Sequence, residues 1–148
     1  MTIHAQRTLR LRKILFALLL ALICIAIIIG VNQNKQWNIP EKDKRRVNPI
    51  QPSREVINAA RVIYLDKCSQ CHGTSGKGDG PDAATYYPSP TNLTDASHIN
   101  SVTDGEIFYQ ISQGRKPMPA FKKRLTEEQR WQLVLLVRSF AAHETSNH

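Results

Sequence analysis

Two cysteines and a histidine stand close together before the middle of the chain, as Cys68-Ser69-Gln70-Cys71-His72. On a helical turn, residues three and four positions apart share one face, so both thiols and the imidazole point to the same side. This spacing is typical of covalent haem attachment, in which two sulfurs bond the porphyrin edge and the histidine binds the iron. We therefore expect Cys68 and Cys71 to form thioether bonds with one haem c, and His72 to be an axial ligand.

Two other uses of a C-x-x-C pair are less well supported. A thioredoxin-like redox site needs a strand–helix–strand context, and no strand-like run flanks these cysteines. A structural zinc site needs a second well-spaced pair of ligands. The other candidate ligands are the scattered His98, His143 and His148, while Cys24 lies within an apolar run. The motif thus favours haem over zinc or a redox dithiol.

Apart from the initiator, the chain has a single methionine, which lies between two prolines as Pro117-Met118-Pro119. Most methionines only fill space in a core. This one follows the predicted end of a helix, and its flanking prolines have fixed φ angles that favour an extended, rigid backbone. A thioether projecting from such a segment suits a second axial ligand. We expect Met118 to complete a six-coordinate iron site with His72.

Charge and composition narrow the class of protein. The formal net charge is +8, but four of the 20 Lys and Arg residues precede the apolar N-terminal run. The rest of the chain is mildly basic and has no basic patch interleaved with aromatic residues, so nucleic-acid binding is not expected. Three cysteines, two of them assigned to haem, cannot build a disulfide framework. An aromatic content of 7% implies a small core, to which a porphyrin would add apolar contact.

The N-terminal part predicts a membrane anchor. The run over 14–31 carries no charge, and as a helix it would be about 27 Å long, the lower limit for spanning a bilayer. No small-residue cleavage site follows, which favours an uncleaved signal-anchor over a secretory signal. The basic cluster within 1–13 indicates a cytoplasmic N-terminus. Proteins with a C-x-x-C-H motif receive their haem outside the bacterial cytoplasmic membrane. We expect a single-pass protein of the bacterial inner membrane with its remaining residues on the periplasmic side.

Residues 32–52 are predicted to be a linker. They combine three prolines and the charge run Glu41-Lys42-Asp43-Lys44-Arg45-Arg46 with no apolar periodicity. Contact of this basic run with lipid headgroups is conceivable, but a solvated tether is the better interpretation. The globular domain is therefore expected over 53–148.

Three helices and two loops are predicted within that domain. Ser53 suits the N-cap of a first helix, whose apolar stripe leads into the cysteine motif. The capping box Thr103-Asp104-Gly105-Glu106 opens a second helix, and Gly114 is placed to end it. A second box, Thr126-Glu127-Glu128-Gln129, opens a last helix that should pack on the first. Of the loops, 73–80 is rich in glycine, and 86–93 is rich in proline and offers a carbonyl to the Nδ1–H of the histidine.

With these features placed, the chain from about Ser53 to Phe140 resembles the class I monohaem cytochromes c. It is most similar to the bacterial type found alone or fused to respiratory-chain subunits. The resemblance is carried by the C-x-x-C-H motif, the Pro-Thr-Asn-Leu-Thr run at 90–94, Asp104-Gly105-Glu106-Ile107, Gly114-Arg115-Lys116-Pro117-Met118-Pro119, and Leu125-Thr126-Glu127-Glu128 with Trp131.

The resemblance implies an all-α cytochrome c fold, in which the first and last helices of the domain cross around one covalently bound haem. A single transmembrane helix would precede this fold. The resemblance also implies thioether bonds at Cys68 and Cys71, iron ligation by His72 and Met118, and the carbonyl of Pro90 as the acceptor for the histidine.

A haem iron held by histidine and methionine has no open position for a substrate, which favours electron transfer over bond chemistry. The soft thioether stabilises ferrous iron and raises the reduction potential. We therefore expect a membrane-tethered electron carrier rather than an enzyme, one without a small-molecule substrate. It would pass single electrons between protein partners of the respiratory chain. Docking on an acidic partner is expected to use the basic residues around the methionine: Arg115, Lys116, Lys122, Lys123 and Arg124.

Two alternatives stay open. One is a haem-based sensor or small-ligand enzyme in which Met118 is displaced from the iron. The other is a cytochrome subunit of a larger oxidase or reductase, which needs the same exposed haem edge as a free carrier.

Overall fold

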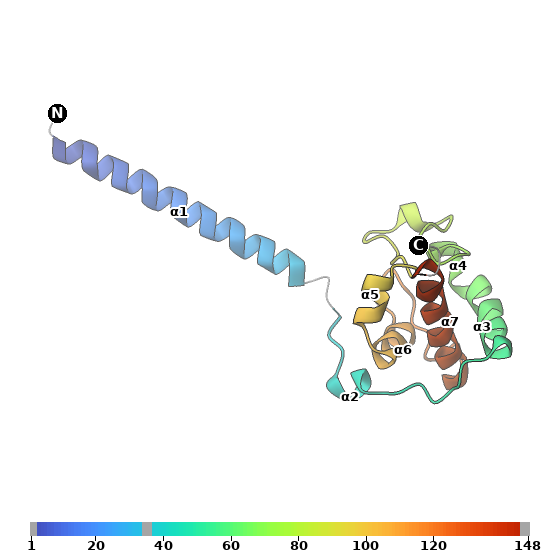
Figure 1. Ribbon diagram of the computed structural model, residues 1–148. Helices are drawn as coiled ribbons and strands as arrows, with labels where there is room; N and C mark the ends of the chain where they lie inside the picture. Colours follow the sequence, from blue (N-terminus) through green and yellow to red (C-terminus); the bar gives the residue numbers. More distant parts are fainter. Residues whose placement is uncertain (1–2, 34–36, 146–148) are drawn as a thin grey trace. The chain divides into compact units, whose positions relative to one another are not determined.

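The protein, described here by a computed structural model, divides into two units, Met1–Asn38 and Ile39–His148. The structure describes the backbone of residues 3–33 and 37–145. The predicted N-terminal segment, linker and domain therefore include positions outside the described residues, namely 1–2, 34–36 and 146–148. Figure 1 shows the long helix of the first unit and the bundle of shorter helices of the second.

The first unit consists mainly of one helix, α1 (Ile3–Gln33). It includes both the basic segment and the aliphatic run, and large apolar side chains such as Leu18 and Leu22 are exposed. Within the part of the chain that the structure describes, no helix combines the length and the apolar character needed to cross a bilayer. The transmembrane helix predicted over 14–31 is therefore not confirmed.

The second unit contains only helical elements among its described residues, apart from an isolated bridge between Arg115 and Met118. This confirms the prediction of an all-α domain. The elements are α2 (Glu41–Lys44), α3 (Arg54–Lys67), α4 (Ser69–His72), the 3₁₀-helix η1 (Ala83–Thr85), α5 (Ala96–Ser101), α6 (Asp104–Gln113) and α7 (Glu127–Thr145).

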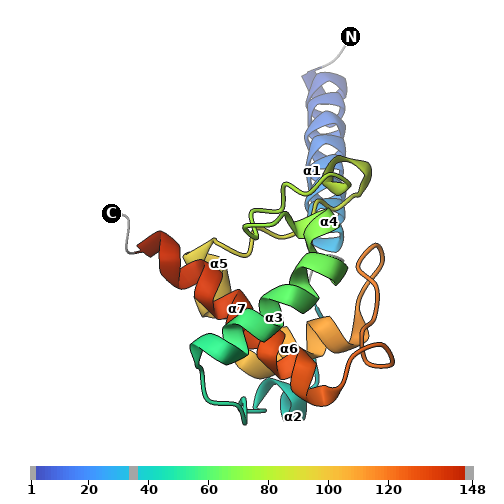
Figure 2. The same cartoon turned by 90° about the vertical axis from the view of Figure 1, so that its right-hand side faces the viewer.

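Helices α3 and α7 cross and form the centre of this unit (Figure 2), as predicted. Ala60 of α3 is fully buried, and its small side chain allows close approach of the two helices. Tyr64 of α3 and Phe140 of α7 meet with their ring centroids 5.1 Å apart. The predicted stripe of α7 lies in the same core, where Leu136 is fully buried. Full burial of a large apolar side chain such as that of Leu136 contributes about 1.5–3 kcal/mol to folding.

Side chains define the helix ends, largely where the sequence predicts them. The Oγ of Ser53 accepts from the Val56 amide at 3.2 Å and caps α3. Thr103 and Glu106 form the reciprocal capping box of α6, and Thr126 and Gln129 exchange the two equivalent bonds at the start of α7. These bonds satisfy amides that have no partner inside their helix.

The end of α6 and the start of α5 also have local causes. Gly114 ends α6 with a φ of 59°, which favours glycine. Helix α5 was not predicted, although Asp95 caps it by accepting from the amides of Ser97 and His98.

Residues 39–52, which we name the strap, pack on the helical core. Ile39 is buried, and α2 lies against α6. The hydroxyl of Thr103 donates to the carbonyl of Lys44 at 2.7 Å, and Asn48 donates to the carbonyl of Trp131 at 3.0 Å. The strap is thereby attached to the starts of both α6 and α7.

Arg46 and Gly105 show why this attachment is close. The Arg46 guanidinium lies 4.4 Å from the centroid of the Phe108 ring and 5.1 Å from that of Trp131, and it pairs with Glu127. A Cβ on Gly105 would lie 2.1 Å from the carbonyl oxygen of Asp43, so only glycine fits there.

The predicted linker over 32–52 is therefore wrong from Ile39 onward, and the domain boundary moves from residue 53 to residue 39. The strap is held by polar, cationic and backbone contacts, which leave no apolar periodicity in the sequence. Both ribbon views place α2 and α4 at opposite ends of this unit (Figures 1 and 2).

Candidate haem site

The cysteine motif forms one helical turn at the junction of α3 and α4. The amides of Cys71 and His72 donate to the carbonyl of Cys68 at 3.2 and 2.9 Å. Neither cysteine forms a disulfide, both are half-buried, and Cys68 packs against the core. The motif thus forms the helical turn that its spacing predicts.

The environment of the thiols differs from that of a redox dithiol. Burial, and to a smaller extent the neighbouring Cys71 and Asp66, raises the pKa of Cys68 to about 12. Burial and Asp82 also raise the pKa of Cys71. Reactive dithiols instead have a lowered thiol pKa, because the thiolate is the nucleophile. The electrostatics therefore do not favour thioredoxin-like chemistry.

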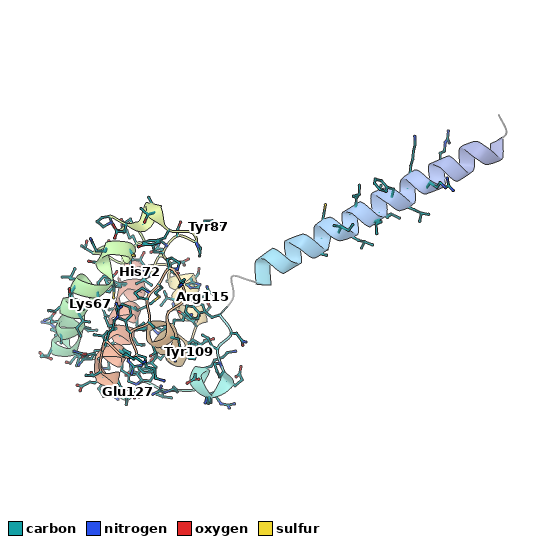
Figure 3. The ribbon with its side chains drawn as sticks, turned by 180° about the vertical axis from the view of Figure 1, so that it is seen from behind. Lys67, His72, Tyr87, Tyr109, Arg115 and Glu127 are labelled. Carbon is teal, nitrogen blue, oxygen red and sulfur yellow. The ribbon has the colours of Figure 1, made fainter. Side chains whose placement is uncertain are left out.

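The ring of His72, labelled in Figure 3, is oriented by a backbone carbonyl. Its Nδ1 lies 3.0 Å from the carbonyl oxygen of Thr91. Because Nδ1 then carries the proton, Nε2 keeps its lone pair, which is the arrangement that a metal-binding histidine needs. Burial lowers the pKa of His72, while the bond to Thr91 acts in the opposite direction. The ring is thus kept neutral at neutral pH.

The acceptor is Thr91, so the predicted role of the Pro90 carbonyl is wrong by one residue. The Pro90 carbonyl points elsewhere: a Cβ on Gly78 would lie 2.6 Å from its oxygen. Gly78 has a φ of +77°, and its lack of a side chain lets the two loops approach each other. The sequence gives no sign of which carbonyl turns toward the imidazole, because an acceptor of this kind needs no particular side chain.

Backbone hydrogen bonds fasten the glycine-rich loop to the segment that carries Thr91. The amide of Leu93 donates to the carbonyl of Gly76 at 2.6 Å, and the amide of Gly78 donates to the carbonyl of His72 at 2.8 Å. The loops predicted over 73–80 and 86–93 are therefore connected beside the histidine, and the short helix η1 lies between them in sequence.

Met118 lies in the loop that joins α6 to α7. Its amide donates to the carbonyl of Arg115 at 2.9 Å and closes a turn, which corrects the expectation of an extended backbone. The side chain is half-buried and packs against the core. Buried Phe121 fixes the far end of the loop, since its amide donates to the carbonyl of Ile111 at 3.1 Å. The thioether therefore projects from a backbone that is fixed at both ends.

The basic residues predicted for docking lie along this same loop, and all of them are exposed: Arg115, Lys116, Lys122, Lys123 and Arg124. Arg115 is labelled in Figure 3. The structure therefore leaves them accessible to a partner while Phe121, between them in sequence, faces the core.

These groups suit a covalently bound haem. Two thiols share one turn, and an imidazole beside them has a free Nε2 and a fixed ring. The glycine-rich loop beside the histidine has no side chain at Gly78, where it approaches the Pro90 carbonyl. The thioether of Met118 projects from a separate loop between α6 and α7. A soft sulfur and an imidazole are ligands that haem iron accepts.

Comparisons with known proteins agree with this chemistry. The family model described as "Cytochrome C oxidase, cbb3-type, subunit III" matches residues 55–137. The cbb3-type cytochrome c oxidase subunit FixP of Bradyrhizobium diazoefficiens is 35% identical over 77 residues, which make up 50% of this chain and 24% of FixP. The chain thus spans about a quarter of the length of that curated relative.

Among solved structures, the fold is similar to that of a chain in the Kuenenia stuttgartiensis reducing HAO-like protein complex Kustc0457/Kustc0458. The two are 27% identical with a TM-score of 0.56, and the match covers 72% of this chain and 52% of the other. The family match covers more than half of the sequence and includes both the cysteine motif and Met118. The chain therefore belongs to the cytochrome family described by that model, and it is a monohaem class I cytochrome c with one covalently bound haem c.

Proposed function

We propose that this electron-carrying cytochrome passes single electrons between protein partners through a haem iron ligated by His72 and Met118. The observation that carries the proposal is the hydrogen bond between Nδ1 of His72 and the carbonyl of Thr91 at 3.0 Å. It fixes the ring and leaves Nε2 for the metal. A carrier needs such a fixed ligand, because a change of oxidation state is fast when little has to rearrange.

Each residue of the site has a distinct role in this proposal. Haem c supplies a one-electron iron couple when it is bound. Cys68 and Cys71 hold the porphyrin edge, and His72 binds one side of the iron. Met118 binds the other side, leaves no position for a substrate, and favours ferrous iron. The core formed by α3 and α7 holds in place the turn that carries Cys68, Cys71 and His72.

The ligation is tested by Met118→Leu, which keeps the side-chain volume and removes the sulfur. The oxidised wild-type protein should show the weak far-red absorption band of a sulfur–iron bond, and the variant should lose it. The reduction potential should fall, since axial ligands set haem potentials over a range of about 0.8 V. Lys122→Ala, at an exposed position of the same loop, should keep the band.

A wild-type protein without that band would contradict ligation by Met118 and favour a sensor or small-ligand enzyme. A variant that keeps the band would contradict it as well, because another group would then bind the iron.

The exposed basic residues of the 115–124 loop support docking on an acidic partner. Electrostatic steering raises association rates and weakens as salt screens it. Lys122→Glu with Lys123→Glu should slow electron transfer to an acidic redox protein and flatten its dependence on ionic strength. Lys42→Glu on α2, an exposed lysine outside this loop, is the control and should change neither. A wild-type rate that is independent of salt would contradict docking through this loop.

We also propose that the N-terminal segment tethers the protein to the bacterial inner membrane, with the haem domain on the periplasmic side. The uncharged run over 14–31 and the exposed apolar side chains of α1 support this. The full chain should stay with the membrane fraction after alkaline washing. A variant with Leu18→Lys and Leu22→Glu should be released, whereas Leu18→Ile with Leu22→Ile should not. Release of the wild-type protein would contradict the tether.

The family match and the likeness to FixP favour one further possibility, a role as a cytochrome subunit of a larger oxidase. Purification in mild detergent separates the two cases. A stable complex would accompany a subunit, whereas a free carrier would run alone and bind partners only transiently.

A further inference from the structure

Tyr64 makes a contact that the apolar stripe of α3 does not require. Its side chain is only 1% exposed, and its hydroxyl donates to the carbonyl of Gly73 at 2.7 Å. Gly73 directly follows the histidine of the haem motif. A phenylalanine at position 64 would fill the same core space, so the hydroxyl serves this carbonyl rather than packing.

The Gly73 carbonyl belongs to a set of hydrogen bonds that surrounds His72. The amide of Gly76 also donates to Gly73, at 3.2 Å, and the amide of Gly78 donates to the carbonyl of His72. The amide of Leu93 in turn donates to the carbonyl of Gly76. We name residues 73–78 and 91–93, joined by these bonds, the histidine frame. Thr91, the acceptor for the imidazole, lies in its second segment.

Phe140 of α7 anchors the frame from the other side. Its ring stands 5.1 Å from that of Tyr64, centroid to centroid. A Cβ on Gly76 would lie 2.9 Å from the same ring, so the loop rests directly on it. The crossing of α3 and α7 is thereby connected to the frame at two points, the Tyr64 hydroxyl and Gly76.

We propose that Tyr64 is a positioning residue for the haem iron: its hydroxyl holds the histidine frame in place, and the frame holds the His72 imidazole at a set orientation. The inference rests on the proposed role of His72 as an iron ligand. Without the hydroxyl, the frame loosens, and the bond from Nδ1 to Thr91 weakens. A weaker bond makes the imidazole a poorer electron donor to the metal, and the reduction potential rises.

The test is Tyr64→Phe, which removes one oxygen and keeps the ring. Its readouts are the reduction potential and the paramagnetic NMR shifts of the haem methyl groups, which report the orientation of the axial imidazole. The control is Ile99→Val in α5, a buried position outside the frame that lowers stability by loss of a methyl group. We expect Tyr64→Phe to raise the potential and redistribute the methyl shifts, and Ile99→Val to leave both unchanged.

A second measurement is amide hydrogen exchange, and its first result comes from the wild-type protein alone. In the wild-type holoprotein, the amides of Gly76 and Gly78 should exchange with solvent as slowly as those in the middle of α3. In Tyr64→Phe they should exchange about fivefold faster, as expected for the loss of one hydrogen bond. Rapid exchange in the wild-type protein would mean that the frame is not rigid, and this would overturn the proposal.

The outcomes separate this inference from the proposed function. A wild-type spectrum that lacks histidine ligation would refute the assigned ligand itself. A histidine-ligated wild type, together with a Tyr64→Phe variant whose potential and methyl shifts match those of Ile99→Val, would refute only the positioning role. Tyr64 would then contribute to stability alone.

Discussion

The strap side of the haem-binding unit and the loops around His72 are held together by different means. At the strap side, large side chains are buried and a guanidinium lies over two aromatic rings. Around His72, most side chains of the loops are exposed, and backbone hydrogen bonds and glycines hold the chain. Figure 3 shows Glu127 and His72 at these two ends. From this comparison we expect substitutions at the strap side to affect mainly stability, and substitutions in the loops around His72 to affect mainly the iron.

The largest effect on stability is expected in the central core. Leu136→Ala removes a fully buried side chain of α7 and should lower the free energy of unfolding by about 2–5 kcal/mol. The visible spectrum of the folded holoprotein should not change, because the residue lies outside both ligand loops. Urea denaturation followed by circular dichroism measures the loss. An unchanged unfolding midpoint would mean that α7 is not packed as described.

Gly105→Ala tests the strap by overpacking. The new Cβ would meet the Asp43 carbonyl at 2.1 Å, so the strap must shift, at a cost of about 1–3 kcal/mol. Trypsin should then cleave faster within residues 42–46. Gln113→Ala, at an exposed position of the same helix, is the control and should not accelerate cleavage. Equal cleavage of both variants would show that the strap is already loose.

Gly78→Ala likewise adds a Cβ, but in the loops around His72 and not at the strap. Its Cβ would meet the Pro90 carbonyl, and its positive φ is unfavourable for alanine by about 1–2 kcal/mol. We expect much of this cost to be absorbed locally, so the unfolding midpoint should change less than in Gly105→Ala. The reduction potential should change more. The two regions would not be distinct if both variants shifted potential and midpoint in parallel.

The smallest expected effect concerns pH. The hydrogen bond from Arg46 lowers the pKa of Glu127 in the folded protein. A group with a lowered pKa stabilises the fold above its ordinary value, and this contribution is lost as pH falls through the folded-state pKa. Because the carboxylate is exposed, the loss should be small. The gap between the urea midpoints of wild type and Arg46→Gln should therefore narrow below about pH 4.5, the ordinary value for a glutamate. The part of the gap that remains reflects the lost contacts with Phe108 and Trp131. A constant difference across this range would exclude the ion pair as its cause.

The sequence predicted those parts of the molecule in which side-chain chemistry determines the backbone. Ser53, Thr103 and Thr126 cap helices because their hydroxyl oxygens accept hydrogen bonds from backbone amides. The apolar stripe of α7 is buried because its side chains avoid water. The cysteine motif predicted its own turn for the same reason.

The missed features depend on backbone atoms or on distant partners. Thr91 accepts through its carbonyl, which any residue could provide, so Pro90 was as good a candidate. The strap depends on Arg46 and Asn48 reaching α6 and α7, more than sixty residues later in the chain. Asp95 had the side chain of a cap, but the six residues of α5 are too few to show a period.

The place where the chain joins the haem-binding unit has a mechanical consequence. The strap joins at Ile39 and fastens to the starts of α6 and α7, at the end opposite α4. A pull transmitted along the backbone from residues before 39 would first load these contacts. The bonds that orient His72 would bear that load only after the helical core had yielded. We therefore expect movement of the chain before residue 39 to leave the orientation of His72 unchanged.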